Sequence, residues 1–376
     1  MALAQTNLRI AFYIGSLEQG GSERHVVRLL EALPRAGFSV DLVLNIKSGP
    51  FLEQVQRLGI EPTEIRLEAT TLGRFRFVIQ LAQYLRDGQF DILQSYNDIS
   101  MFYAGLATIL AQKPVLICGQ RHTMEYGSWS KSKLITWTYR YLARYIIVNS
   151  RATSKMIVDR CQVPAGKIKV AYNGVETRSP RSPEKTFQKR LELGLPPRII
   201  TIGMVARLTP LKQVNVFIQV AEKLKDFPVQ FVVVGDGEIL GDLQGQVEAG
   251  GFSDRFRFVG FQASPIGWME TFDIGVICSS TEGLPAVVME YMAAGVPIVS
   301  FDLGGISEVV IQNETGFIVP AGDHDAMAET LRVLVLNMEL RQHLGSNGQA
   351  FVGKNCSLAQ EAALYANIYR DCWRSS

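Results

Sequence analysis

Residues 8–33 read LRIAFYI GSLEQGG SERHVVRLLEAL, three segments of different composition. Leu8 to Ile14 is almost wholly apolar, which predicts a buried strand. Gly15 to Gly21 follows as a loop, and Ser22 to Leu33 carries apolar residues at helical spacing until Pro34 ends the pattern. A buried strand, a glycine-bearing turn and a helix in this order are typical of a doubly wound α/β domain.

The same alternation of short apolar strands and helices continues along the rest of the chain. In the first half, further strands are predicted at residues 40–44, 90–94, 114–118 and 145–148. In the second half, strands are predicted at residues 199–205, 229–234, 256–259, 274–278 and 296–300. With 376 residues, and roughly 100–200 residues per domain, we expect two Rossmann-like domains with parallel sheets that face a central cleft.

A change in composition near the middle of the chain sets the expected domain limits. Around residues 173–197 the pattern lapses into Arg-Ser-Pro-Arg-Ser-Pro and Leu-Gly-Leu-Pro-Pro, which is the composition of a linker. We therefore expect a first domain over residues 1–178, a linker over 179–197 and a second domain over 198–356.

The overall composition excludes several classes of protein. Apolar residues make up 47% of the chain and charged residues 20%, so disorder, collagen and a coiled coil all fit badly. No stretch of about 18 uncharged apolar residues occurs and the first residues lack a signal-peptide pattern, so neither a membrane span nor export is predicted. The five cysteines are odd in number and form no Cys-x-x-Cys pair, so we expect no zinc site, no disulfide framework and a cytoplasmic location.

The net charge of +2 is unevenly distributed. Residues 1–178 hold 22 Lys and Arg against 14 Asp and Glu, whereas residues 179–376 hold 16 against 22. Within the first half, residues 126–158 hold six Lys and Arg and no acidic residue. A run of this kind indicates a surface that meets anions.

In a helix, part of this basic segment would form a single face. Lys133, Trp137, Arg140 and Arg144 are spaced i, i+4, i+7 and i+11, with Trp129 and Lys131 close by. An anionic membrane suits such a face, because basic residues attract the headgroups and aromatic residues lie at the interface. Nucleic acid is a weaker rival, and a solvated helix with a buried Trp137 is the plainer alternative.

Gly20, Gly21, Ser22 and Glu23 stand between the first predicted strand and its helix. Bare backbone amides at a helix amino terminus favour anions, so a diphosphate is the ligand that suits this turn. The plainer alternative is an ordinary strand-to-helix turn in which Ser22 is the N-cap.

A second loop, Ala206 to Lys212, also follows a predicted strand. Thr209 is placed as N-cap and Pro210 as the first helical residue, which puts Lys212 in the first turn of the helix. A cation there opposes the helix dipole, so an anion between Arg207 and Lys212 would explain the placement. A solvated surface lysine is the alternative.

The densest pattern runs from Ser279 to Pro297 and reads SSTEGLPAVVMEYMAAGVP. Gly283 and Leu284 offer backbone amides, and Pro285 suits the first turn of a helix. Glu290 lies on an otherwise apolar helical stretch, where a carboxylate must find donors, and the two hydroxyls of a ribose would supply them. A structural glutamate that binds a neighbouring loop is the alternative.

In this order, the motifs resemble those of retaining glycosyltransferases of the family 4 type, which have the GT-B fold, and the resemblance covers nearly the whole chain. The motifs that carry it are Gly20-Gly21-Ser22-Glu23, Asn149-Ser150, Tyr172-Asn173-Gly174-Val175, Arg207 with Lys212, Val234-Gly235-Asp236-Gly237, Glu282 with Glu290, and Gly304-Gly305-Ile306-Ser307-Glu308.

The resemblance implies an acceptor-binding first domain and a donor-binding second domain, with a C-terminal helix at residues 357–376 that packs back on the first. It implies that Arg207 and Lys212 neutralise the donor diphosphate, that Glu290 holds the ribose, and that Glu282 lies near the transferred sugar. The other donor-binding positions that it implies are Gly20, Gly21, Gly235, Gly260, Phe261, Gly283, Leu284 and Pro285.

In such families cations and helix termini replace a catalytic metal, so no metal cofactor is expected. Asp323 and Asp325 have the Asp-x-Asp spacing but occur late, beside a predicted loop. The family often carries a histidine near the acceptor sugar, a role that Arg121 or His122 would fill here, and His122 as an ordinary loop residue is the alternative. Ala206 and Gln213 stand where many relatives have glycine, which leaves the path of the phosphate loop open.

The residues and the resemblance together predict a retaining glycosyltransferase of polysaccharide biosynthesis. Its donor would be a UDP-sugar or GDP-sugar, and its acceptor a hydroxyl of a glycan, or of a lipid-linked glycan at the cytoplasmic face of the inner membrane. The alternatives are a sugar-nucleotide epimerase or hydrolase on the same scaffold, and a catalytically inactive nucleotide-binding module. A Rossmann dehydrogenase is disfavoured, because no Gly-x-Gly-x-x-Gly follows the first strand.

Overall fold

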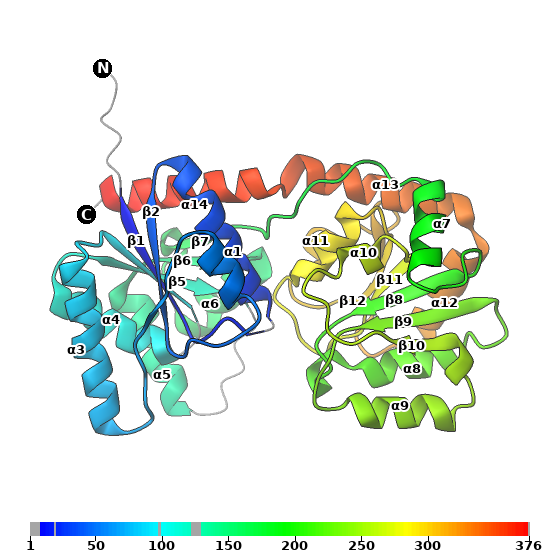
Figure 1. Cartoon of the computed structure of the whole chain (residues 1–376), viewed down its shortest axis with the longest axis horizontal. Coiled ribbons are helices and arrows are strands. Elements are labelled where there is room, and N and C mark those ends of the chain that lie inside the picture. Colours follow the sequence, from blue (N-terminus) through cyan, green and yellow to red (C-terminus); the bar gives the residue numbers. More distant parts are fainter. Residues whose placement is uncertain (1–7, 19, 97–98, 122–128, 375–376) are drawn as a thin grey trace, which may run out of the picture. The chain divides into compact units, whose positions relative to one another are not determined.

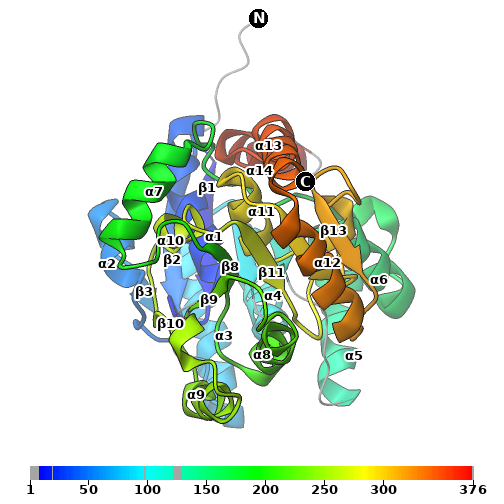
Figure 2. The same cartoon turned by 90° about the vertical axis from the view of Figure 1, so that its right-hand side faces the viewer.

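The computed structural model describes residues 8–18, 20–96, 99–121 and 129–374 (Figure 1). The chain divides into two units, one made of residues 1–173 with 358–376 and the other of residues 174–357. Each unit has a parallel sheet with helices on both faces (Figures 1 and 2). The predicted fold class of two doubly wound α/β domains is confirmed.

The first unit holds a seven-stranded parallel sheet in the order β3-β2-β1-β4-β5-β6-β7, which changes direction between β1 and β4. Its strands are β1 (Arg9–Ile14), β2 (Ser39–Leu44), β3 (Thr63–Glu64), β4 (Ile92–Tyr96), β5 (Val115–Gln120), β6 (Ala143–Val148) and β7 (Ile168–Val170). Its helices are α1 (Gly21–Ala32), α2 (Leu52–Arg57), α3 (Thr71–Asp87), α4 (Ile99–Ala111), α5 (Trp129–Trp137), α6 (Arg151–Cys161) and α14 (Leu358–Arg374). The short turns are the 3-10 helices η1 (Pro34–Ala36) and η3 (Ala165–Lys167) and the π-helix η2 (Thr138–Leu142).

Two separate helical layers cover this sheet. α3 and α4 pack on one face, where Phe77 and Leu81 are buried. α1 and α14 pack on the other, where Leu30 and Tyr369 are buried. Because α14 ends the chain and α1 lies near its start, the two ends of the sequence close one core (Figure 1).

The second unit holds a six-stranded parallel sheet in the order β10-β9-β8-β11-β12-β13. Its strands are β8 (Ile200–Val205), β9 (Val229–Val234), β10 (Phe256–Phe258), β11 (Ile274–Ile277), β12 (Ile298–Phe301) and β13 (Gly316–Val319). Its helices are α7 (Pro183–Glu192), α8 (Val214–Glu222), α9 (Leu240–Ala249), α10 (Ile266–Met269), α11 (Ala286–Ala293), α12 (His324–Leu336) and α13 (Met338–Asn355), with the 3-10 turns η4 (Pro210–Lys212), η5 (Ser253–Arg255) and η6 (Ile306–Glu308).

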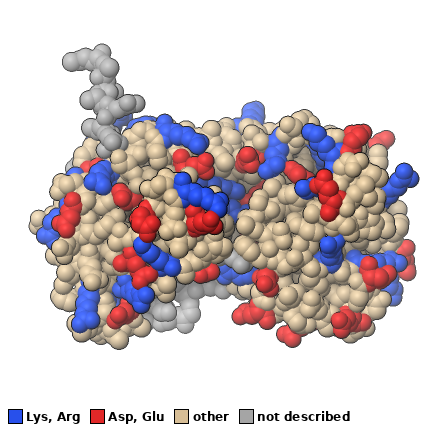
Figure 3. All heavy atoms as spheres, in the orientation of Figure 1, with Lys and Arg blue, Asp and Glu red and all other residues tan. Residues whose placement is uncertain are grey.

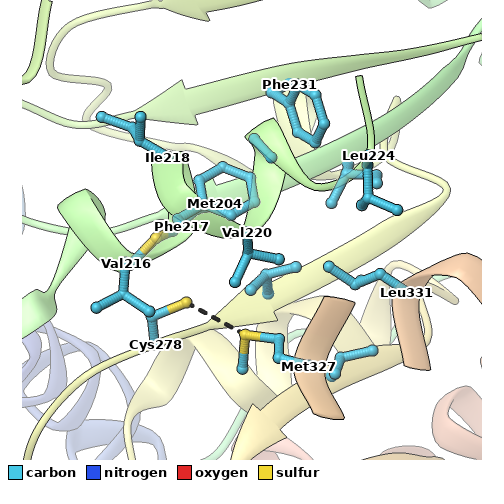
Figure 4. Packing of buried hydrophobic residues seen from close by; sticks show 14 of the residues in the cluster. Met204, Val216, Phe217, Ile218, Val220, Leu224, Phe231, Cys278, Met327 and Leu331 are labelled. Carbon is cyan, nitrogen blue, oxygen red and sulfur yellow. Dashed lines mark hydrogen bonds between the residues drawn. The ribbon is translucent and has the colours of Figure 1, made fainter. Parts of the chain in front are cut away.

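An apolar core anchors the strand that leads into the densest sequence motif. Phe217 and Val220 of α8 and Leu331 of α12 are buried against the sheet (Figure 4). Cys278, directly after β11, joins this core, and its sulfur lies 3.5 Å from that of Met327 (Figure 4). The packing of Cys278 therefore fixes the position at which the following loop begins.

A helix occupies the region where composition predicts a linker. α7 begins after Ser182, whose hydroxyl caps it, with Pro183 as its first residue. Arg190 is buried and donates from Nε to the Thr271 carbonyl at 2.9 Å, so the segment packs on the second unit. The prediction of a linker over residues 179–197 is corrected, because Ser-Pro is a helix start as well as a loop signal.

Surface charge and cysteine placement are those of an ordinary folded protein. Acidic and basic side chains are interspersed on the face that Figure 3 displays. All five cysteines are buried and carry free thiols. Among the described residues, each helix is too short or too polar to cross a membrane.

Candidate active site

The candidate site of the second unit lies at the carboxyl ends of β8 and β11. These strands are neighbours in the sheet, at the point where the strand order changes direction. In open α/β sheets a crevice forms there, because the loops after two such strands turn to opposite faces. Here the two loops are residues 206–213 and 278–285, which hold the basic and the acidic motifs of the sequence.

The loop after β8 departs from the predicted helix start. Residues 210–212 form the one-turn η4, and Gln213 follows with a φ of 48°, in the left-handed region. α8 begins only at Val214. The predicted N-cap Thr209 and first helical residue Pro210 are confirmed for this short turn, which ends at Lys212. Gln213 separates Lys212 from α8. Glycine adopts this left-handed conformation without strain, whereas a residue with a Cβ does not.

An ion pair joins the two loops. Nζ of Lys212 lies 2.5 Å from Oε1 of Glu282, and the Ser279 hydroxyl donates to the same oxygen at 2.6 Å. The Glu282 side chain is 11% exposed and that of Lys212 30%, so the pair is sheltered but reachable from solvent. Arg207 is exposed at the same edge of the sheet. Two cations and one carboxylate thus gather at the end of β8 and β11.

Helix α11 is fastened to β8 through a buried tyrosine. The Tyr291 hydroxyl accepts from the Val205 amide at 2.8 Å and lies 3.3 Å from the Gly203 carbonyl, to which it donates. Burial raises the pKa of Tyr291 well above its ordinary value, so the hydroxyl keeps its proton. Glu290, the preceding residue, is also buried. Its carboxylate is therefore held at a fixed position on α11.

Glycines let neighbouring loops approach this site. Gly304, in the loop after β12, has a φ of 53°, and a Cβ there would lie 1.9 Å from the Glu282 carbonyl oxygen. The next amide, of Gly305, donates to the Gly283 carbonyl. A Cβ at Gly235, after β9, would lie 1.9 Å from the Ala206 carbonyl oxygen. These glycines let the loops around the site pass close to one another. The Gly304-Gly305 pair indicates this role only when the loop that it contacts is known.

The remaining donor-binding candidates lie close by on the same unit. The Gly235 amide donates to the Gly260 carbonyl at 2.9 Å, which ties the loops after β9 and β10 together. Phe261 is half-buried next to that contact, and Leu284 is buried between Gly283 and Pro285. Pro285 is the N-cap of α11, one position before the predicted first turn.

At the switch point of the first unit, the loop after β1 leads to Gly20. Gly20 is the N-cap of α1, which begins at Gly21, so the alternative in which Ser22 caps this helix is wrong. A Cβ at Gly20 would lie 2.0 Å from Oε2 of Glu23, so glycine lets this carboxylate fold over the helix start. The carboxylate stabilises the amino terminus of α1, and an anion bound there would have to displace it.

Arg121 stands at the carboxyl end of β5 and is held on two sides. Its guanidinium donates to the side-chain oxygen of Asn173, and its carbonyl accepts from Nδ2 of Asn149 at 2.9 Å. His122 lies outside the described residues. Of the two residues predicted to contact the acceptor sugar, the structure therefore describes the position of Arg121.

A buried polar network next to Arg121 was not anticipated from the sequence. Nδ1 of His25 lies 3.0 Å from Oε1 of Glu361, and its Nε2 lies 3.2 Å from the Tyr96 hydroxyl. Burial, and then the charge of Arg121, lower the pKa of His25 to about 4 although Glu361 opposes the shift, so the ring is neutral at pH 7. The partners come from α1, β4 and α14, which only the fold brings together.

The Asp-x-Asp pair belongs to a helix start. Asp323 caps α12 by accepting from the Ala326 amide at 2.8 Å, and Asp325 lies 2.6 Å from Nζ of Lys223. Within the ranges that the structure describes, no group of three or more His, Cys, Asp and Glu is placed to hold a metal ion.

The predicted basic helical face is wrong in one respect. The helix ends with η2, and Ala143 is extended and pairs with Leu116 of β5, so Arg144 lies on a strand. Trp137 is exposed, with its ring centroid 6.0 Å from that of Tyr141, which contradicts the alternative of a buried tryptophan. The side chains of residues 129–131 lie outside the described part of the chain.

Two family models match this chain. The model for glycosyl transferases group 1 matches residues 186–351, and the model for Glycosyltransferase Family 4 matches residues 19–179. The chain belongs to this glycosyltransferase family. The first match covers most of the second unit of the glycosyltransferase and the second match most of its first unit, so the resemblance seen in the sequence is confirmed.

Curated relatives of this glycosyltransferase include a galactosyltransferase and a polysaccharide biosynthesis protein. It is 24% identical to the UDP-Gal:alpha-D-GlcNAc-diphosphoundecaprenol alpha-1,3-galactosyltransferase of Escherichia coli, over 83% of this chain and 84% of that protein. It is 27% identical to the Vi polysaccharide biosynthesis protein VipC/TviE of Salmonella typhi over 83% of this chain. That match spans 62% of the Salmonella protein, less than two thirds of its length.

Solved structures share the fold of this glycosyltransferase. Anabaena Alr3699/HepE in complex with UDP superposes with a TM-score of 0.85 at 21% identity, over 97% of this chain and 100% of that one. WaaG, a glycosyltransferase involved in lipopolysaccharide biosynthesis, gives a TM-score of 0.78 at 15% identity, over 96% and 99%. The fold is GT-B, as the sequence predicted.

Proposed function

We propose that this glycosyltransferase transfers a sugar from a uridine diphosphate sugar to a hydroxyl of a lipid-linked glycan, with retention at the anomeric carbon. The observation that carries the proposal is the Lys212–Glu282 ion pair at the carboxyl ends of β8 and β11, where the loop after β8 also holds Arg207. A diphosphate requires cationic donors in a sheltered place, and this edge of the sheet supplies two. The UDP complex of Alr3699/HepE and the UDP-Gal specificity in the name of the Escherichia coli relative favour uridine as the base.

In this proposal the Lys212–Glu282 ion pair changes when the donor binds. Without donor, Glu282 compensates the charge of Lys212 at 2.5 Å. A diphosphate carries more charge than one carboxylate, so it draws Lys212 toward itself. Glu282, still held by the Ser279 hydroxyl, is then left to accept hydrogen bonds from the hydroxyls of the transferred sugar.

The transfer step follows from this arrangement. The bond between the anomeric carbon and the diphosphate oxygen breaks, and its electron pair leaves with the diphosphate, where Arg207 and Lys212 stabilise the developing charge. The acceptor oxygen forms its bond to the anomeric carbon on the same face, and its proton passes to the departing phosphate oxygen. The two cations supply the charge compensation for which other transferases use a metal.

The remaining donor contacts come from the second unit. Glu290, fixed on α11, accepts from the ribose hydroxyls, and the amides of Gly283 and Leu284 face the diphosphate. Gly235, Gly260, Phe261 and Pro285 shape the walls for the nucleotide. Within the first unit, Gly20 and Gly21 remain candidates for contacting an anion at the start of α1, where the Glu23 carboxylate would have to move aside.

The acceptor lies, in this proposal, against the first unit. Arg121, held by Asn173, presents a cation with guanidinium donors at the carboxyl end of β5. A lipid-linked acceptor is favoured because the Escherichia coli relative acts on a diphosphoundecaprenol substrate. The enzyme then works at the cytoplasmic face of the membrane and contacts it through its basic first unit.

The test is turnover with defined donors. The protein is incubated with UDP-sugars and GDP-sugars, with excess chelator and with a diphosphate-lipid acceptor, and the product anomer is assigned by NMR. We expect acceptor-dependent release of UDP at a rate that the chelator leaves largely intact. Release that needs no acceptor would favour a hydrolase or epimerase, an inverted product would remove retention, and nucleotide binding without turnover would indicate an inactive module.

A further inference from the structure

The two strands that lead into the proposed donor loops separate before they end. β8 and β11 lie side by side (Figure 2) and pair at two positions, of which Gly203 with Gly275 is the last. Each strand then continues along its other neighbour, β8 along β9 as far as Val205 and β11 along β12 as far as Ile277. The last two residues of β8 and the last two of β11 are therefore not paired with each other.

The corresponding strands of the first unit stay together for longer. β1 and β4, which flank the switch point of that unit, pair at four positions. The last of these positions, Tyr13 with Ser95, is one residue before the end of each strand. The early end of the pairing between β8 and β11 is thus a local feature of the second unit and does not follow from the strand order alone.

A tyrosine of α11 takes the place of the next hydrogen bond between these strands. By the register of the pairing, the Val205 amide would donate next to the carbonyl of Val276. It donates instead to the Tyr291 hydroxyl at 2.8 Å, and this hydroxyl donates to the Gly203 carbonyl at 3.3 Å. Burial raises the pKa of Tyr291, so the hydroxyl keeps the proton that it donates. One side chain thus supplies both the acceptor and the donor that a neighbouring strand would supply.

Two glycines make room for this arrangement. A Cβ at Gly275 would lie 2.9 Å from the ring of Tyr291, so glycine lets the ring lie against the strand. A Cβ at Gly203 would lie 2.1 Å from the ring of Phe272. Both rings are fully buried, and their centroids are 6.3 Å apart. The last pair between β8 and β11 is therefore a pair of glycines with an aromatic ring packed against each, and this packing fixes the position of the hydroxyl.

The loops that follow the two strands meet again farther along the chain. The Ser280 amide donates to the Leu211 carbonyl at 2.9 Å. The segment that carries Arg207 is thus held at its start by the contact between Val205 and Tyr291, and at its end by the bond at Leu211. The course of this segment depends on both contacts.

We propose that Tyr291 is a positioning residue of the donor site, because its hydroxyl ends the pairing of β8 with β11 and thereby sets the separation of the loops 206–213 and 278–285. The inference rests on the proposed function for the ligand, a diphosphate that contacts both loops. A tyrosine that merely stabilises the core would contribute to the stability of the chain without contributing to the affinity for UDP.

The test compares two buried hydroxyls of the second unit. Tyr291→Phe removes the hydroxyl between the strands and keeps the ring. Thr271→Val is the matched control, because Thr271 is also fully buried and its hydroxyl donates to the Trp268 carbonyl at 2.6 Å, on the amino-terminal side of β11. For each protein, calorimetry measures the affinity for UDP and thermal unfolding measures the stability. NMR measures the deuterium exchange of the Val205 amide, with the amide of Phe231 in β9 as the internal reference.

Both substitutions should lower the melting temperature, because each removes a buried hydrogen bond. Tyr291→Phe alone should weaken UDP binding, by about tenfold, and should speed the exchange of the Val205 amide relative to that of Phe231 by about tenfold. Wild-type affinity for UDP in Tyr291→Phe, or an unchanged relative exchange rate at Val205, would overturn the inference. An equal loss of affinity in Thr271→Val would also overturn it. A wild type that binds neither UDP nor GDP would remove the proposed donor site and the inference with it, even if Val205 exchanges as expected.

Discussion

The two units share one strand order but build different switch points. In the second unit, the loops at the reversal of strand order carry the partly exposed ion pair of Lys212 and Glu282, and the loop of Lys212 also holds the exposed Arg207. In the first unit, the polar groups near the carboxyl edge are buried, and His25 is neutral between Glu361 and Tyr96. The same topology thus supports an open site for a charged ligand in one unit and a buried polar network in the other.

The two sites differ because the charged side chains of the second unit are partly exposed to solvent, whereas the polar network of the first unit is buried. A partly exposed ion pair can be exchanged for a ligand at small cost, whereas removing any member of a buried polar network lowers the free energy of unfolding. Substitutions in the second unit's loops should therefore change ligand affinity and spare the fold. Those in the first unit's network should change stability and spare donor affinity.

The largest effect is expected when both cations of the second unit are removed. Arg207→Ala and Lys212→Ala should each weaken UDP binding about tenfold to a hundredfold, since a hydrogen bond to a charged group contributes about 1.5–3 kcal/mol. The double variant should bind still more weakly, with an unchanged melting temperature. Calorimetric titration with UDP measures this, and Lys225→Ala, an exposed lysine of the same unit, is the control. Wild-type affinity in both single variants would contradict the diphosphate assignment.

The second-largest effect is expected in the pH dependence of the free energy of unfolding, through His25 of the first unit. His25 has a folded-state pKa of about 4, below its unfolded value near 6.5, so the unfolded chain binds the extra proton between these pH values. The free energy of unfolding should therefore fall as the pH is lowered from 7 to 5, by about 2 kcal/mol from this group. Urea denaturation at the two pH values measures the fall.

The matched variant separates His25 from the carboxylates of the chain. His25→Gln keeps polar atoms toward Glu361 and Tyr96 but does not titrate, so its stability should vary less between pH 7 and pH 5 than that of the wild type. The affinity of both proteins for UDP should remain equal at each pH. An identical pH dependence in the two proteins would mean that folding does not lower the pKa of His25.

The sequence predicts the loops of the second unit's site better than the buried network of the first unit. The alternation of strands and helices, and the switch-point loops at residues 206–213 and 278–285, could be predicted because each motif is local and follows its own strand. The partners of His25 could not, since Tyr96 and Glu361 are distant in sequence and only α14 brings them together. Local patterns gave wrong predictions where one pattern is compatible with two structures. Ser182-Pro183 is typical of a linker but starts α7. Arg144 continues the helical spacing of the residues before it but lies on β6.

A smaller effect is expected at Glu290, which tests whether a buried residue of the second unit serves the ligand or the fold. Glu290→Gln should raise the KM for the donor about tenfold with a lesser change in kcat, because a ribose contact is made equally in the ground and transition states. Glu282→Gln should instead lower kcat. Steady-state kinetics with a UDP-sugar distinguish the two. A Glu290→Gln protein with normal kinetics and a lowered melting temperature would assign the carboxylate to the fold.

The smallest effect is expected at two glutamines, one in each unit, that share a strained backbone. Gln213 and Gln162 have φ values of 48° and 50°, a left-handed conformation that disfavours a Cβ by about 1–2 kcal/mol. Glycine relieves this strain but adds about 0.5–1 kcal/mol of unfolded-state entropy, so Gln213→Gly should stabilise the chain by about 0.5 kcal/mol. Gln162→Gly should gain less, because the Gln162 side chain accepts from Arg140 at 3.2 Å and this bond would be lost. Urea midpoints of the two variants, with Gln213→Ala as the control that keeps the strain, measure the difference. A greater gain at residue 162 than at residue 213 would show that the backbone before α8 is not the more strained of the two.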